Sequence, residues 1–281
     1  MHVLGGRLGA ILIGLLLLAL GIYAGFAAHL YLTQDSKIFF PEPVLQITPD
    51  QIGLPYDEVK LPSSDGVMLH GWYVIAAAKP RATVLYLHGN TGNIGNCLEN
   101  VKQLVLLGMN VLVIDYRGYG GSTGKPSEQG LYDDAEAAWR YLLETRKTNP
   151  QEIVVYGQSL GGAVAGWLAA RHPPGALILE AAFTSLPDSA ADRYPWLPVR
   201  WLARYQFDTL AALKTVRCPV LIVHSVDDEV TSYRHGLRLY DVVSDSKLML
   251  DLHGGHNGAV HDSLMIYTRG IDNFLTRYMP P

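Results

Sequence analysis

The segment IVVYGQSLGG, residues 153–162, puts a serine between a short apolar run and the start of a helical pattern. Residues 153–156 are typical of a buried strand and residues 161–171 have helical spacing, so GQSLG forms the pattern G-x-S-x-G at a strand–turn–helix junction. Glycines on either side of Ser159 leave room for a strained turn, and the N-terminus of the following helix favours negative charge. We therefore predict that Ser159 is a nucleophile.

A carboxylate that orients the catalytic base is expected in a loop that follows another strand. A serine hydroxyl is a poor nucleophile until a base removes its proton, and a third group usually orients that base. The apolar run 220–223 leads into a loop that contains Asp227 and Asp228. We assign the acid to Asp228 and keep Asp227 as the alternative. Neighbouring loop residues point in different directions, so only one of the two should reach the base.

The base is expected in the loop that follows the apolar run 247–250. This loop contains His253, two glycines and His256. The glycines make the turn flexible enough for His256 to reach back over Ser159, so we predict that His256 is the base. His253 is closer to the strand and is the alternative, with a structural role expected for it. His261 is expected to belong to the following helix.

An oxyanion would need preorganised backbone N–H groups. Leu160 supplies one because it follows the serine directly. The second is expected from the loop HGNTGN, residues 88–93, which follows a strand. Asn90 is the preferred donor and Thr91 remains possible, whereas His88 is expected to bond within its own loop.

Composition and motifs exclude several classes of ligand. The chain has 22 basic and 26 acidic residues and a net charge of −4, so there is no basic excess for nucleic acid. Two cysteines cannot form a four-cysteine zinc site, and no His-Glu-x-x-His motif is present. The glycine-rich residues 118–126 resemble a Walker A loop. They have Tyr119 where that loop needs Gly, and Pro126 where it needs Ser or Thr. We expect no metal, cofactor, nucleotide or nucleic acid.

Short apolar runs alternate with helical patterns along most of the chain. Strand-like runs occupy residues 67–75, 82–87, 110–114, 153–156, 176–179, 220–223 and 247–250, and helical spacing occurs at residues 131–145, 161–171, 233–243 and 263–278. This alternation predicts an α/β domain with a mostly parallel central sheet and helices on both faces. We expect this domain over residues 58–281, with a short lid insertion at about residues 181–216.

The N-terminal residues 1–32 contain one charged side chain, Arg7. As a helix, residues 8–28 would span about 31 Å, the thickness of a bilayer core. We predict a single-pass membrane anchor over residues 1–32 and an extended, proline-containing linker over residues 33–57 that runs onto the domain. The positive-inside tendency favours an extracytoplasmic catalytic domain. The alternative is a signal peptide cleaved near residues 25–27, which would give a secreted protein.

Several further motifs accompany the serine turn. They are LHGNTGN (87–93), DYRGYGGS (115–122), GQSLGG (157–162), CPVLIVH (218–224) and GGHN (254–257). Together they resemble the α/β-hydrolase superfamily, and most closely its membrane-anchored, bud-emergence-like serine hydrolases, over about residues 58–278. The resemblance implies a nucleophile at Ser159, an acid at Asp228, a base at His256, Asn90 rather than Thr91 in the oxyanion hole, and one N-terminal anchor.

The acid loop departs from the pattern of that family. The family usually has His-Gly where this chain has His224-Ser225, and it often has Val-Pro where this chain has Val230-Thr231. Both departures lie beside Asp228, so the assignment of the acid depends on how this loop folds. Relatives in the branch hydrolyse esters or thioesters, including lipid-type acyl groups, and the resemblance implies a similar reaction.

The predicted lid is rich in aromatic residues. Because aromatic side chains near a nucleophile suit an apolar acyl chain, we expect Tyr194, Trp196 and Trp201 to line a substrate pocket. The alternative is that these side chains only pack the insertion against the sheet. An anchor that contacts membrane lipid would hold the site near acyl-lipid or acyl-protein esters.

We therefore predict a serine hydrolase that cleaves carboxylic ester or thioester bonds through an acyl-enzyme, with a small-molecule or lipid-type acyl ester as substrate. One alternative is acyl transfer to an acceptor other than water, which would depend on the exclusion of water from the site. The other is a catalytically silent binding protein on a hydrolase fold. Silent relatives usually lose a member of the catalytic set, whereas this chain retains all of them.

Overall fold

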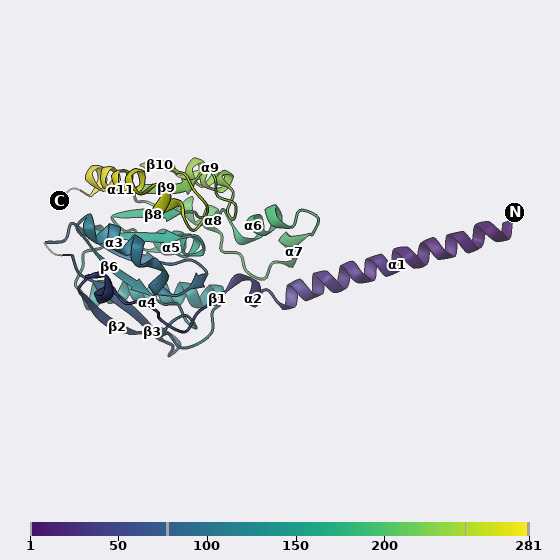
Figure 1. The fold of residues 1–281 in the computed structure, drawn as a ribbon, viewed down its shortest axis with the longest axis horizontal. Coiled ribbons are helices and arrows are strands. Elements are labelled where there is room, and N and C mark those ends of the chain that lie inside the picture. The colour runs from purple at the N-terminus through teal and green to yellow at the C-terminus, as the bar shows by residue number, and fades with distance from the viewer. Residues whose placement is uncertain (1, 77–78, 245, 280–281) are drawn as a thin grey trace.

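The computed structural model describes residues 2–76, 79–244 and 246–279 of the 281-residue chain. Within these residues, eight strands form one sheet in the order β10-β9-β8-β7-β4-β6-β3-β2 (Figure 1). The strands are β2 (Tyr56–Pro62), β3 (Met68–Val74), β4 (Ala82–Leu87), β6 (Met109–Ile114), β7 (Ile153–Gln158), β8 (Ala176–Glu180), β9 (Val220–Ser225) and β10 (Lys247–Leu252). Neighbours from β10 to β6 run parallel, whereas β3 is antiparallel to both β6 and β2.

Helices cover both faces of this sheet. The helices of the domain are α3 (Leu98–Leu106), α4 (Glu128–Glu144), α5 (Leu160–Arg171), α8 (Thr209–Leu213), α9 (Tyr233–Val242), α10 (Ala259–Asp262) and α11 (Leu264–Tyr278), with 3-10 turns η2 (Ile94–Cys97) and η3 (Pro150–Glu152). Helices α4, α5, α8 and α9 share one buried cluster with Leu85 and Leu87 of β4, and α3 and α11 share the other with Val84 and Tyr86. Successive strand residues thus point to opposite faces, and the predicted mostly parallel α/β architecture is confirmed.

The N-terminal helix α1 (His2–Leu32) projects from the domain as one long rod (Figure 1). Its residues Gly9–Leu32 are long and apolar enough to cross a membrane and are not buried by the rest of the protein. This helix fits the predicted single-pass anchor.

The segment after α1 is packed on the domain along part of its length. It contains α2 (Asp35–Ile38), η1 (Pro49–Ile52) and the short strand β1 (Phe40–Pro41), which pairs with β5 (Thr91–Gly92). Phe39 is buried, and its ring makes edge contacts with Tyr205 and Phe207. Residues expected to serve as a linker therefore also contribute to the core.

Residues 181–216, here called the insertion, lie between β8 and β9. They form α6 (Leu186–Arg193), α7 (Val199–Leu202) and α8, and α8 packs against α5. The buried Phe207 joins the insertion to the domain by an edge contact with Tyr132 of α4. Helices α6 and α7 project from the sheet toward the C-terminal end of α1 (Figure 1).

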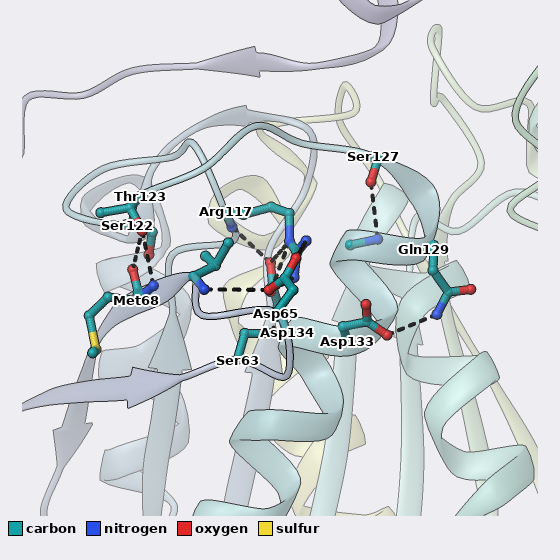
Figure 2. A network of polar contacts seen from close by, with 12 residues as sticks. Ser63, Asp65, Met68, Arg117, Ser122, Thr123, Ser127, Gln129, Asp133 and Asp134 are labelled. Carbon is teal, nitrogen blue, oxygen red and sulfur yellow. Dashed lines mark hydrogen bonds and ion pairs between the residues drawn. The ribbon is translucent and has the colours of Figure 1, made fainter.

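A buried ion pair holds the loop that follows β6. The Arg117 guanidinium donates to Asp134 of α4 at 2.8 Å and to Asp65 at 2.7 Å (Figure 2). The Asp134 side chain is fully buried. In the same loop, the Tyr119 hydroxyl donates to the carbonyl of Asn90 at 2.8 Å. The ion pair thus holds the loop after β6. Through Tyr119, this loop in turn contacts the separate loop that carries Asn90, the predicted oxyanion donor.

Candidate active site

Ser159 occupies a sharp turn between β7 and α5. Its backbone has φ 51° and ψ −116°, a conformation that a residue with a side chain adopts only under strain. The Ser159 N–H donates to the carbonyl of Glu180 on the neighbouring strand at 2.8 Å. A methyl group on Gly161 would collide with the carbonyl oxygen of Leu87, so α5 must begin close to the end of β4. This crowding holds the serine at the carboxyl edge of the sheet.

Three side chains from different strand ends meet at this turn. The Nε2 of His256 lies 3.2 Å from the Oγ of Ser159, and the Nδ1 of His256 lies 2.7 Å from Asp228 Oδ2. Asp228 follows β9 and His256 follows β10. The Asp228 side chain is fully buried and that of His256 is 9% exposed. The structure thus brings together the three side chains predicted to act in catalysis, as a series of hydroxyl, imidazole and carboxylate.

The two alternative residues form a separate pair. Asp227 Oδ2 lies 3.2 Å from His253 Nδ1. Their side chains are 57% and 69% exposed, so solvent screens this pair. This pair is distinct from the contact between Asp228 and His256, even though each of its members stands close to one of those residues in the sequence.

The loop after β9 stabilises Asp228 as an anion. Backbone N–H groups of Val230 and Thr231 donate to Asp228 Oδ1 at 2.9 and 2.7 Å. Burial by itself would raise the pKa of Asp228, but the hydrogen bonds from His256 and these N–H groups bring that pKa below its ordinary value. A proline in place of Thr231, as in the family pattern, would have no N–H to donate. The departure from the family pattern therefore adds a bond to the acid.

The two backbone N–H groups predicted to stabilise an oxyanion belong to residues next to Ser159 in the fold. Within the described part of the chain, the N–H groups of Asn90 and Leu160 have no hydrogen-bond acceptor. The loop that carries Asn90 runs next to the serine, since a methyl group on Gly89 would lie 3.6 Å from the Cβ of Ser159. Thr91, the alternative donor, is the first residue of β5 and lies opposite Phe40 of β1.

A cavity of about 940 Å³ adjoins the site, and Asn90 and Asp228 are part of its wall. Its apolar wall comes from Leu30 and Tyr31 of α1, Ile38 and Phe40 of the following segment, and Leu186, Val199 and Leu202 of the insertion. Its charged wall comes from Lys37, Asp192, Arg193, Glu229 and Arg234, and the imidazole of His235 adds a polar group. Such a wall suits a ligand with an apolar part and a polar or ionic part.

The structure corrects part of the prediction for the insertion. Tyr194 lines the cavity, whereas Trp196 and Trp201 lie outside it. In the short helix α7, Val199 faces inward, and Trp201, two residues later at about 100° per residue, faces the opposite way. The Trp201 side chain is 90% exposed as a result. Trp196 precedes this helix and stacks on Phe26 of α1, with ring centroids 5.5 Å apart.

The segment between α1 and β2 contributes to the site, which the sequence analysis did not predict. The Asn90 side-chain amide donates to the carbonyl of Ile38 at 2.7 Å, so the segment holds the predicted oxyanion loop. The apolar pair Phe39-Phe40 within a proline-containing stretch was the available signal. A solvated linker would not need two adjacent phenylalanines.

A buried carboxylate behind the serine turn was also not predicted. The Glu180 carboxylate, at the end of β8, accepts hydrogen bonds from the Tyr156 hydroxyl and from the amides of Gln158 and Asn100, both at 3.1 Å. Burial raises the pKa of Glu180 above its ordinary value. Gln158 directly precedes Ser159, so the hydrogen bond from its amide to the Glu180 carboxylate helps to hold the serine turn. Its signal was a single acidic residue at the end of an apolar run.

His88 and the two cysteines lie outside the contacts around Ser159. Across residues 2–76, 79–244 and 246–279, no group of three or more His, Cys, Asp or Glu side chains could hold a metal ion. Cys97 and Cys218 are buried thiols, and burial raises the pKa of Cys218 to about 12. His88 is buried and contacts the carbonyl of Gly89 at 2.7 Å, within its own loop.

The sheet, the strained serine turn and the groups at the strand ends have the arrangement of an α/β-hydrolase. The family model described as "Serine aminopeptidase, S33" matches residues 78–207. Protein bem46 of Schizosaccharomyces pombe is 36% identical over 208 residues, which cover 71% of this chain and 70% of that protein. A solved structure of an esterase from Pyrococcus furiosus has a TM-score of 0.69 at 21% identity and covers 86% of this chain and 98% of its own.

A further relative carries a lipase name. The lysophosphatidylserine lipase ABHD12 of Danio rerio is 34% identical over 196 residues, which cover 63% of this chain and 51% of that protein. The chain belongs to the bem46-like branch of the α/β-hydrolase superfamily. The family and its esterase and lipase relatives support a hydrolase activity.

Proposed function

We propose that this chain is a membrane-anchored serine hydrolase that cleaves carboxylic ester or thioester bonds in acyl, lipid-type substrates. The observation that carries the proposal is the series Ser159, His256 and Asp228, with contacts of 3.2 and 2.7 Å. A base that touches both the hydroxyl and a buried carboxylate is the arrangement that activates a serine. The strained backbone of Ser159 supports the same role.

The proposed reaction runs in two steps. The Ser159 Oγ attacks the substrate carbonyl carbon while its proton passes to His256 Nε2, and the N–H groups of Asn90 and Leu160 stabilise the oxyanion. When the intermediate collapses, the C–O or C–S bond breaks and the leaving group takes that proton from His256. Water then attacks the acyl-enzyme in the same way, which releases the acid and restores the serine. Asp228 stays anionic and orients His256 throughout.

The substrate class is inferred from the cavity. An apolar wall built from α1, its following segment and the insertion suits an acyl chain, and the nearby charged residues suit a polar leaving group. The name of the relative ABHD12, a lysophosphatidylserine lipase, is consistent with a substrate of this general kind. We propose an acyl ester with a polar head rather than a purely apolar ester.

We further propose that α1 anchors the enzyme and that the hydrolase domain is extracytoplasmic. Arg7, the single charged residue before the apolar segment, supports this orientation. Protease added outside intact cells should digest the domain, whereas a domain that is degraded only after lysis would contradict the orientation. The mass of the mature chain separates an uncleaved anchor from a secreted form cut near residues 25–27.

Labelling with a fluorophosphonate probe tests the proposed activity. The full-length protein should be labelled covalently and Ser159→Ala should not, because the probe reacts with an activated serine. A wild-type protein that is not labelled would overturn the proposal. A series of p-nitrophenyl esters of increasing chain length then tests the substrate class, and a preference for short chains alone would contradict the acyl-lipid assignment.

A further inference from the structure

The insertion is fastened to the part of α1 that is apolar enough to cross a membrane. The ring of Trp196 stacks on Phe26 at 5.5 Å, and the Tyr23 hydroxyl donates to the Trp196 carbonyl at 3.2 Å. Just beyond α1, the side chain of Gln34 donates to the Leu202 carbonyl at 2.8 Å. These contacts fix the position of the insertion along the axis of α1, which is here called its height.

That height can be compared with the thickness of a bilayer. The membrane-crossing candidate Gly9–Leu32 has 24 residues and a length of about 36 Å, and Phe26 lies about 9 Å inside its Leu32 end. The hydrocarbon core of a bilayer is about 30 Å thick, so an upright and centred segment puts Phe26 about 6 Å below the hydrocarbon boundary. Because Trp196 stacks on Phe26, insertion of α1 brings Trp196 to the same level.

The exposed surface of the insertion has the chemistry of a membrane interface. Trp201 is 90% exposed and Trp196 is 57% exposed, although large aromatic side chains usually avoid water. Tryptophan is enriched at membrane interfaces, where its ring meets the acyl chains and its N–H meets the headgroups. Arg200 directly precedes Trp201 and has a side chain 67% exposed, paired with Asp188 at 2.9 Å; Arg204 is 38% exposed and pairs with Asp35 at 3.3 Å. The N–H groups of both guanidiniums that these pairs leave over can donate to lipid phosphates.

We propose that the surface formed by Trp196, Arg200, Trp201 and Arg204 docks on a glycerophospholipid bilayer beside α1. The inference rests on the membrane anchoring proposed above and extends it to the insertion. The residues Leu30 and Tyr31, at the end of the membrane-crossing candidate, line the cavity together with Val199 and Leu202 of α7. The cavity therefore opens at the height of the headgroups, and an acyl substrate enters it from the bilayer.

Tryptophan fluorescence in brominated vesicles tests the docked surface directly. The full-length protein is reconstituted in palmitoyl-oleoyl phosphatidylcholine vesicles, with and without bromine near the headgroup end of the acyl chains. Of the five tryptophans, Trp72 and Trp139 are buried in the domain and Trp167 stacks on Tyr132 at 4.5 Å. We expect bromine to quench the emission, and we expect the double variant Trp196→Phe, Trp201→Phe to lose most of this quenching. The control Trp167→Phe should retain it.

The outcomes separate this inference from the proposed function. Protein that floats with the vesicles but is not quenched, or is quenched equally in the double variant, overturns the docked surface and leaves the anchor intact. Protein that does not float with the vesicles contradicts both. Fluorophosphonate labelling of the wild type in the same vesicles reports the serine hydrolase activity independently of either result.

Discussion

The carboxylate of Asp228 lies 2.7 Å from the imidazole of His256, while the carboxylate of Asp227, one residue earlier, lies 3.2 Å from His253. Two acidic residues and two histidines in the same pair of loops thus form two distinct contacts. The first is buried and leads to Ser159, and the second is exposed to solvent. Because the Asp228 side chain is buried, solvent screens its negative charge little. That charge therefore contributes strongly to the contact with His256.

Asp228→Asn should therefore be far more damaging than Asp227→Asn. An asparagine at position 228 has no charge to stabilise a protonated His256 and can hold it in the wrong tautomer, so we expect kcat to fall about 10⁴-fold. Asp227→Asn should keep a rate close to that of the wild type. Ester hydrolysis by the two purified variants measures this difference, and equal losses in both would contradict the assignment of Asp228.

The serine turn depends on how closely α5 approaches the end of β4. A methyl group on Gly161 would collide with the carbonyl oxygens of Leu87 and His88, whereas one on Gly166 would make ordinary contacts with Thr209 and Ala212. Both glycines belong to α5, Gly161 in its first turn and Gly166 in its middle. They differ in whether neighbouring backbone must move.

Gly161→Ala should therefore destabilise the protein by about 1–3 kcal/mol through overpacking. It should also weaken fluorophosphonate labelling, because it separates the N–H of Leu160 from that of Asn90. Gly166→Ala should raise the free energy of unfolding by up to about 1 kcal/mol, since alanine favours a helix. Unfolding in detergent, followed by circular dichroism, measures both changes. If the two variants are equally stable, the close approach is not a constraint.

The serine turn could be predicted because its signal is local. A buried strand, two glycines and a helical pattern lie within about twenty residues, and β7 and α5 differ from the predicted ranges by at most two residues at an end. The choice of Asp228 over Asp227 depended on the family resemblance as well, because both follow the same strand. Their different directions are visible only in the folded loop.

Features that depend on distant contacts were harder to predict. Residues 33–57 were expected to form a linker that runs onto the domain, but the contacts of Phe39 with Tyr205 and Phe207, more than 160 positions away, have no local signal. Trp201 was expected in the pocket because it is aromatic, but the single turn of α7 points it outward. Strand β2 was not predicted because it is an edge strand with most side chains exposed, so its apolar signal is weak.

The buried Glu180 should make stability depend on pH. Burial raises its pKa in the folded protein, whereas the unfolded chain has the ordinary value of about 4.3. The folded state therefore keeps this proton to higher pH, and the free energy of unfolding should fall as pH rises from about 4.3 through the raised value. Glu180→Gln removes this titration, so its stability should fall less over the same range.

Urea unfolding in detergent at a series of pH values measures the effect. Glu144→Gln is the matched control, because it also replaces a glutamate by glutamine but at an exposed position, the end of α4. A wild type and a Glu180→Gln variant with parallel pH profiles would show that Glu180 does not titrate differently in the folded state.

The ion pair between Arg117 and Asp134 should be costly to break from one side. Asp134 is fully buried, and it accepts bonds from both the guanidinium and the backbone N–H of Arg117 (Figure 2). Arg117→Met would leave this carboxylate buried without a cation, which should destabilise the protein by about 3–5 kcal/mol. Asp65→Asn removes a carboxylate that is 47% exposed, and we expect a cost of about 1 kcal/mol or less.

The double variant Arg117→Met, Asp134→Leu separates charge burial from lost packing. With no carboxylate left to bury, it should recover part of the stability that Arg117→Met loses. Recovery should be incomplete because the backbone N–H of Arg117 would lose its acceptor. Since the loop after β6 holds Asn90 through Tyr119, Arg117→Met should also slow fluorophosphonate labelling, even where the protein remains folded. A double variant no more stable than Arg117→Met would mean that packing, rather than the unpaired charge, sets the cost.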